Sequence, residues 1–120
     1  MTVYNANDFN RVFRETRLGV GVTGQAVTIK LDRIKPRRCR TLTHVTVENR
    51  TNDYPKCRIG IERAGRNHYL DELTVIVADE LAVSRSDILL GEGDVFFAEL
   101  TGTTTGDNLV MTCIGWELDL

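Results

Sequence analysis

From residue 26 onward, apolar and polar side chains alternate with a period of two, which is the spacing of a β-strand with one buried face. The clearest run covers residues 39–49, where Val45 and Val47 are expected to face inward and His44, Thr46 and Glu48 outward. Further strands are predicted at residues 26–31, 56–62, 73–77, 81–84, 95–100 and 109–118. Many short strands separated by turns predict an all-β fold, a single antiparallel β-sandwich of jelly-roll or Ig-like type over residues 21–120.

The turns between these strands have suitable chemistry. Residues 50–55 (RTNDYP) and 101–108 (TGTTTGDN) are polar and rich in turn-forming residues. Residues 91–94 (GEGD) could suggest a phosphate-binding loop, but a phenylalanine-rich strand follows instead of a lysine and a helix. We therefore expect a tight turn in which a glycine adopts positive φ and Asp94 accepts a hydrogen bond from the turn backbone.

The first twenty residues differ from the rest of the chain. Phe9, Val12 and Phe13 follow helical spacing, yet so short a helix is not stable alone in water and must dock on its own domain or on a neighbouring subunit. Residues 18–24 (LGVGVTG) contain three glycines and are interpreted as a flexible joint. Residues 1–20 are thus predicted to form an N-terminal assembly arm.

The last predicted strand is apolar on both faces. Leu109 and Met111 point one way, whereas Val110 and Trp116 point the other, and the adjacent Phe96–Phe97 pair repeats the pattern. The second face is therefore expected to be covered, by the N-terminal arm or by another subunit, and this predicts a homo-oligomer.

Composition limits the class of protein. A chain of 120 residues fits one domain, and it has neither an apolar run long enough for a transmembrane helix nor the pattern of a signal peptide. We expect it in the cytosol or in a particle assembled there. The three cysteines have no CxxC spacing, so they are expected to be reduced and buried, and a zinc site with His44 or His68 matches no known ligand spacing. No cofactor or metal is expected. No acid, base and nucleophile converge in the pattern, so we do not expect an enzyme.

Charge is unevenly distributed along the chain. Residues 1–66 carry 14 Lys or Arg and 6 Asp or Glu, whereas residues 67–120 carry Arg85 against 11 acidic residues. Strands from both halves could pair their charges within one sheet, which we favour, or the molecule could have a basic and an acidic surface suited to assembly. The densest basic segment, RIKPRRCR at 33–40, could contact nucleic acid, but no aromatic residues interleave with it and the pI is about 5.7. An acidic protein surface is the favoured partner, and nucleic acid is the alternative.

Three segments of the last two thirds of the chain form a recognisable pattern: VTVENRT at 45–51, HYLDELTVIVADELAVSRSDILLGEGDVFFAELTG at 68–102 and the closing strand at 109–118. In these segments the chain resembles small β-sandwich virion proteins of tailed bacteriophages. The resemblance implies a capsid decoration (cement) protein that binds the major capsid protein, or a neck or tail component, and no enzyme. The hypothesis is therefore a homo-oligomeric virion protein, with a trimer favoured, that assembles in the host cytoplasm.

Seven side chains are predicted to contact partners. They are Phe9, Phe13, Arg33, Lys35, Arg37, Arg38 and Trp116. The rival hypothesis is a receptor- or carbohydrate-binding module, for which the candidate aromatics are Tyr54, Tyr69 and Trp116. Trp116 is expected to be occupied in packing, which weakens that rival.

Overall fold

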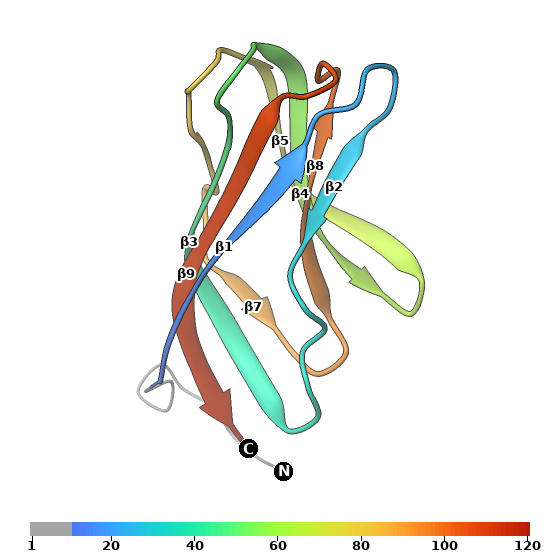
Figure 1. Ribbon diagram of the computed structural model, residues 1–120. Helices are drawn as coiled ribbons and strands as arrows, with labels where there is room; N and C mark the ends of the chain where they lie inside the picture. The colour runs from blue at the N-terminus through green and yellow to red at the C-terminus, as the bar shows by residue number, and fades with distance from the viewer. Residues whose placement is uncertain (1–10) are drawn as a thin grey trace.

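The structure is a computed structural model that describes residues 11–120, and all its regular elements over that range are strands. Figure 1 shows how they are arranged. The strands are β1 (Arg11–Val20), β2 (Val27–Lys30), β3 (Arg38–Asn49), β4 (Tyr54–Arg63), β5 (Arg66–Ile76), β6 (Ala82–Val83), β7 (Ile88–Leu90), β8 (Val95–Thr101) and β9 (Asn108–Asp119).

Two antiparallel sheets pack face to face and confirm the predicted β-sandwich (Figure 1). The five-stranded sheet has the order β1-β9-β3-β6, and β7 pairs with β3 further along the same edge. The four-stranded sheet has the order β2-β8-β4-β5. With β6 and β7 sharing one strand position, this order is that of a jelly roll, in which strands distant in sequence become neighbours.

The core lies between the two sheets and is formed by the inward positions of the predicted alternation. Leu42, Phe96, Leu100, Leu109 and Met111 are completely or almost completely buried. Each such side chain contributes about 1.5–3 kcal/mol when it leaves water, so this layer supplies the main stabilisation. Val45 and Val47 are buried and His44 is exposed, as their alternation predicts.

The prediction of a short helix near the N-terminus is wrong for its described part. Val12 and Phe13 lie in β1, which pairs with β9 over ten residues, from Arg11 opposite Glu117 to Val20 opposite Asn108. Phe13 is buried in the core, whereas Phe9 lies outside the described residues. Ten ladder positions outweigh the weak helical preference of three apolar residues, because a short helix gains too few hydrogen bonds to offset its nucleation cost.

The flexible joint predicted at residues 18–24 is also wrong. Its first residues belong to β1, and the next ones are fixed to the loop before β9: Gly21 N donates to Asp107 O at 2.9 Å and Val22 N donates to Thr103 Oγ1 at 3.2 Å. A Cβ atom on Gly21 would lie 2.3 Å from Thr104 O. The glycine is therefore needed for close backbone contact and not for mobility.

The bounds of several strands differ from the prediction, most of all in the second half of the chain. β5 begins at Arg66, well before the predicted start at residue 73, and forms with β4 a hairpin that extends beyond the body of the sandwich (Figure 1). β6 is shorter than predicted, and the three residues of β7 are not among the predicted strands. The turn at 91–94 is confirmed, since Gly93 has φ 86° and Asp94 Oδ2 accepts a hydrogen bond from Gly91 N at 2.9 Å.

Candidate docking surface

The outward-facing side of the five-stranded sheet, here called the outer face, is unusually apolar for a surface. Strand register places its side chains in rows that run across the sheet, because residues opposite each other on adjacent strands share one face. One row contains Val12, Trp116, Thr41 and Leu89, contributed by β1, β9, β3 and β7 in turn. Val12 is 60%, Trp116 41% and Leu89 66% exposed.

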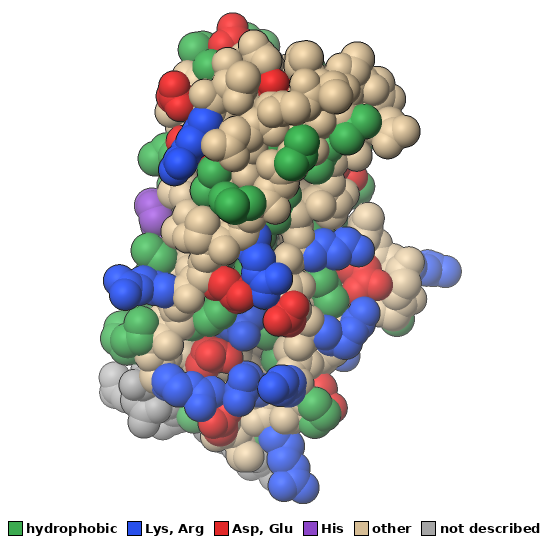
Figure 2. All heavy atoms as spheres, viewed as in Figure 1, with side chains coloured by type: hydrophobic (Ala, Val, Ile, Leu, Met, Phe, Trp, Pro, Cys, Tyr) green, Lys and Arg blue, Asp and Glu red, His purple; other side chains and the backbone are tan. Residues whose placement is uncertain are grey.

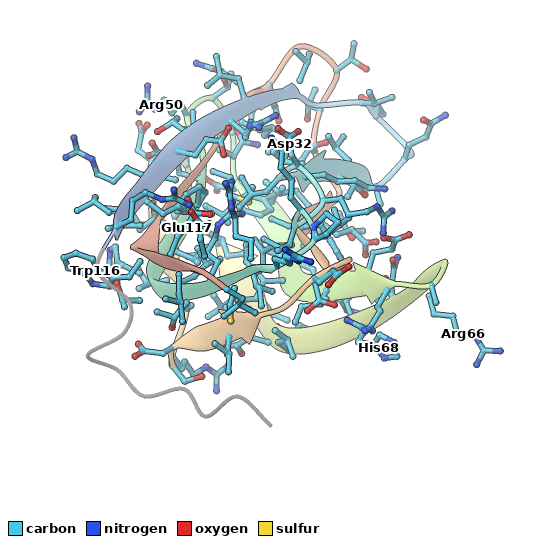
Figure 3. All side chains as sticks on the ribbon, turned by 90° about the horizontal axis from the view of Figure 1, so that it is seen from below. Asp32, Arg50, Arg66, His68, Trp116 and Glu117 are labelled. Atoms are coloured by element: carbon cyan, nitrogen blue, oxygen red, sulfur yellow. The ribbon has the colours of Figure 1, made fainter. Side chains whose placement is uncertain are left out.

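Trp116 anchors this row and projects away from the sandwich, whereas its neighbour Glu117 points between the sheets (Figure 3). The expectation that Trp116 is occupied in intrachain packing is therefore wrong. Large exposed aromatic side chains flanked by aliphatic ones are typical of protein interfaces, where tryptophan is among the residues that contribute most to binding. The row is the strongest candidate for a docking surface in the described part of the chain.

The expected cover over the second face differs between the two sheets. On the outer face of the four-stranded sheet, Phe97 is buried and packs against Tyr69, with ring centroids 5.7 Å apart and an interplanar angle of 82°. On the outer face of the five-stranded sheet, Val110 is buried but Trp116 is not. On the four-stranded sheet the outward Phe97 is thus shielded within the chain by Tyr69 of β5, whereas on the other sheet Trp116 remains exposed.

The basic segment 33–40 does not form one free patch. Arg38 Nε lies 3.1 Å from Asp119 Oδ1, and Arg40 is buried with a terminal guanidinium nitrogen 3.2 Å from Glu117 Oε2. The Arg40 guanidinium also lies 3.8 Å from the ring centroid of Phe13, at a distance typical of a cation–π contact. The favoured account of the charge asymmetry, in which strands of the two halves pair their charges, is confirmed for these arginines.

The remaining basic residues of the segment lie at the end of the sandwich where the loop before β3 turns. Arg33 donates to Gly93 O at 2.8 Å and lies 3.3 Å from Glu62 Oε2. Lys35 and Arg37 are exposed, and neither forms an ion pair with a residue in the range 11–120. Figure 2 shows Lys and Arg side chains gathered over the lower half of the molecule with Asp and Glu between them. Among the predicted contact residues, Lys35, Arg37 and Trp116 are therefore available to a partner, whereas Phe13, Arg33 and Arg38 have intrachain partners.

The thiols and imidazoles show no convergent chemistry. Cys39, Cys57 and Cys113 are free and buried, each inside a strand as predicted. Burial raises the pKa of Cys57 and of Cys113 to about 12, so both thiols are strongly protonated at neutral pH. Within residues 11–120, no group of His, Cys, Asp and Glu could hold a metal ion, and no helix is long and apolar enough to cross a bilayer.

Sequence reasoning missed part of the outer face for two reasons. Leu89 lies in a strand of only three residues, which is too short for alternation to be recognised. The helical spacing of Val12 conceals its position beside Trp116. The only available signal is the two-faced apolar pattern of the last strand, which correctly indicates the sheet but not the exposed end.

Comparison with known proteins finds likeness in fold only. No protein-family model matches the chain, and no curated protein matches it. A protein of Bacillus endospore appendages, described as a family of disulfide-linked pili, has a TM-score of 0.46 at 12% identity over 100% of this chain and 98% of its own. A mutant of a family 29 carbohydrate-binding module has a TM-score of 0.45 at 13% identity over 94% of this chain and 78% of its own. Dimeric latent PorU from Porphyromonas gingivalis has a TM-score of 0.41 at 10% identity over 97% of this chain and 14% of its own.

These scores are all below 0.5, so the similarities concern the β-sandwich alone and give no information about function. The functional argument therefore depends on the surface of this chain.

Proposed function

We propose that this protein is a structural subunit of a tailed-bacteriophage virion, with capsid decoration favoured over a neck or tail position. In that role it forms a homo-oligomer and binds the major capsid protein or another virion protein without catalysing a reaction. The phage assignment comes from the sequence resemblance in the second half of the chain. The observation that carries the assembly role is the exposed row of Val12, Trp116 and Leu89 across the outer face.

A subunit that adds to a preformed particle needs a rigid body and a docking surface that is ready before contact. The outer face meets this need because its side chains are held by strands and not by loops, so little conformational entropy is lost on docking. Exposed apolar side chains at Val12 and Leu89 beside Trp116 would leave water in the complex, which favours association.

The test is rebinding of purified protein to particles that lack it. We expect wild-type protein to sediment with these particles and Trp116→Glu to remain in the supernatant, because a carboxylate cannot be buried without a partner. Val77→Glu, which places the same charge at an exposed apolar residue just after β5, is the matched control and is expected to rebind. Equal rebinding of wild type and Trp116→Glu would contradict docking through this face, and failure of wild type to rebind would contradict the virion role.

A carbohydrate- or receptor-binding module is the second candidate, and one feature favours it. Tyr69 is partly exposed beside a shallow hollow lined by Arg58, Asp71, Glu72 and Arg85, a mixture of aromatic and polar groups suited to sugars. However, the Arg58 guanidinium lies 4.7 Å from the Tyr69 ring centroid and covers part of the surface on which a sugar would stack. Binding to a glycan array that is lost in Tyr69→Ala would move this candidate to first place.

A further inference from the structure

Apart from Val83 on β6, the most exposed apolar side chains of the outer face form two groups at opposite ends of the strands. Val12, Trp116 and Leu89 form the first group, near the start of β1 and the end of β9. Leu18 and Val20, which are 72% and 63% exposed, form the second group at the other end of β1. Between them runs an uncharged row of Thr16, Thr112 and Thr46 from three adjacent strands, which ends at Val83 on β6.

The other polar side chains of the outer face are also divided by this threonine row. Arg14 and His44 lie in the row next to the Trp116 end, and Glu48 lies in the row on the other side. His44 and Glu48 are four residues apart on β3, a separation of about 13 Å along the strand. They are therefore too far apart to pair within one chain, although both face the same way.

The size of the face is adequate for a protein interface. Four strand positions at about 4.8 Å and ten residues at about 3.4 Å give a projected area of roughly 650 Å². A stable interface buries about 800 Å² on each partner, and the corrugated side-chain surface exceeds its projection. A face of this extent can bind one partner of similar flatness, such as another sheet packed about 10 Å away.

We propose that the partner on the outer face is a second copy of this chain, packed face to face with its strands antiparallel across a two-fold axis that passes over Thr112. The inference takes from the proposed function only the outer face as a docking surface. The dimer occupies that face, so dimerisation and docking of the same face on a particle exclude each other. The two-fold relation brings the Trp116 end of each copy opposite the Leu18–Val20 end of the other. The two apolar groups therefore cover each other at both ends of the interface. It also brings His44 of each copy opposite Glu48 of the other.

The orientation follows from the position of Glu48. If the strands of the two copies ran parallel across the interface, Arg14 would face His44 and Glu48 would face Leu18, leaving the carboxylate against an apolar side chain instead of an imidazole that can donate a hydrogen bond to it. The antiparallel arrangement removes that conflict. Arg14 then lies against Leu18 of the other copy, where its aliphatic stem can cover the leucine while the guanidinium reaches solvent.

Sedimentation analysis of the full chain over a range of concentrations tests the contact. We expect a reversible monomer–dimer equilibrium that Trp116→Glu weakens about 30-fold or more, as removal of a buried aromatic anchor does, and that Val77→Glu leaves unchanged. Thermal melting of each variant establishes that it is folded. A wild-type chain that is monomeric at all concentrations, or a trimer, would overturn the two-fold contact.

A charge swap tests the orientation. His44→Asp places a carboxylate opposite Glu48 of the other copy, and Glu48→Lys also removes the 2.8 Å contact to Arg50 within the chain. Each single variant is expected to dimerise at least about 5-fold more weakly, and the double variant to recover most of the wild-type affinity, because a carboxylate and an ammonium group then face each other. Losses that simply add in the double variant would overturn the antiparallel arrangement.

The outcomes separate this inference from the proposed function. Monomeric protein that still rebinds to particles through Trp116 would reject the second copy as partner while supporting the virion role. Dimeric protein that does not rebind to particles would support the inference and reject the virion role.

Discussion

Asp107 offers the sharpest test of how the sandwich is held together at its loop end. Its carboxylate is buried and accepts hydrogen bonds from Asn49 Nδ2 at 2.8 Å, Asn52 Nδ2 at 2.6 Å and Thr104 N at 2.8 Å. The donors come from two separate segments, one at the end of β3 and the loop after it, the other in the loop before β9. One side chain therefore connects segments that are far apart in the sequence.

The cost of Asp107→Ala can be worked out from these contacts. A hydrogen bond to a charged group contributes about 1.5–3 kcal/mol, and a buried donor left without a partner costs about 1–3 kcal/mol. Asn49 is fully buried and loses its acceptor, whereas Asn52 is exposed and can turn to water. We expect the free energy of unfolding to fall by about 3–5 kcal/mol, which at this chain length lowers Tm by about 10–20 °C.

The assay is urea unfolding followed by Trp116 fluorescence, with Asp53→Ala as the control. Asp53 is exposed and accepts a single hydrogen bond, from Ala78 N at 2.8 Å, so its loss is expected to cost at most about 1 kcal/mol. Equal losses for Asp107→Ala and Asp53→Ala would refute the reasoning, because burial and the number of donors would then have no effect.

Acid adds a second measurement on the same residue. Burial raises the pKa of Asp107, but the hydrogen bonds from Asn49, Thr104 and Asn52 outweigh burial and hold its pKa below the usual 3.8. The folded state then binds this proton less readily than the unfolded state, so the stabilisation is present above about pH 4 and is lost as the pH falls through the folded pKa. We expect Asp107→Ala to remove this part of the acid dependence. An unchanged acid profile would contradict it.

Three further outcomes are expected. Deleting residues 1–20 removes β1 and the buried Phe13, so we expect loss of cooperative unfolding by circular dichroism, and a truncated chain that melts like wild type would show that β1 is dispensable. Burial raises the pKa of Cys57 and Cys113 to about 12, above the unfolded value near 9. The contribution of these two thiols to the free energy of unfolding is therefore expected to be complete below about pH 9 and to be lost as the pH rises toward 12. Urea unfolding at several pH values should show a flatter alkaline profile when both cysteines are replaced by alanine. Val75 is 83% exposed with φ 55°, so Val75→Gly is expected to stabilise the fold by about 0.5–1 kcal/mol in urea unfolding, and destabilisation would contradict backbone strain there.

Most of the strands and the inward positions of the core follow from the amino-acid sequence alone. Alternation with period two is a local property. It correctly predicts that Val45 and Val47 face inward in β3, and that Leu109 and Met111 share one face of β9 opposite to Val110 and Trp116. The Gly91–Asp94 turn is also predictable, because its hydrogen bond and its positive φ involve residues only three positions apart.

Which residues meet across the sheets depends instead on the tertiary structure. β1 is a strand because β9, about a hundred residues later, supplies its hydrogen-bond partners, and no local pattern contains that information. A second long-range pairing, between β3 and β9, explains the basic segment. Arg38 and Arg40 form ion pairs with Asp119 and Glu117, and these residues come together only when the two strands are neighbours. Trp116 is exposed for a related reason. Its strand, β9, lies in the middle of the sheet, but no element of the described chain covers the outer face on which Trp116 lies. Alternation in the sequence shows which residues of a strand lie on opposite faces, but it does not show which of the two faces another element will cover.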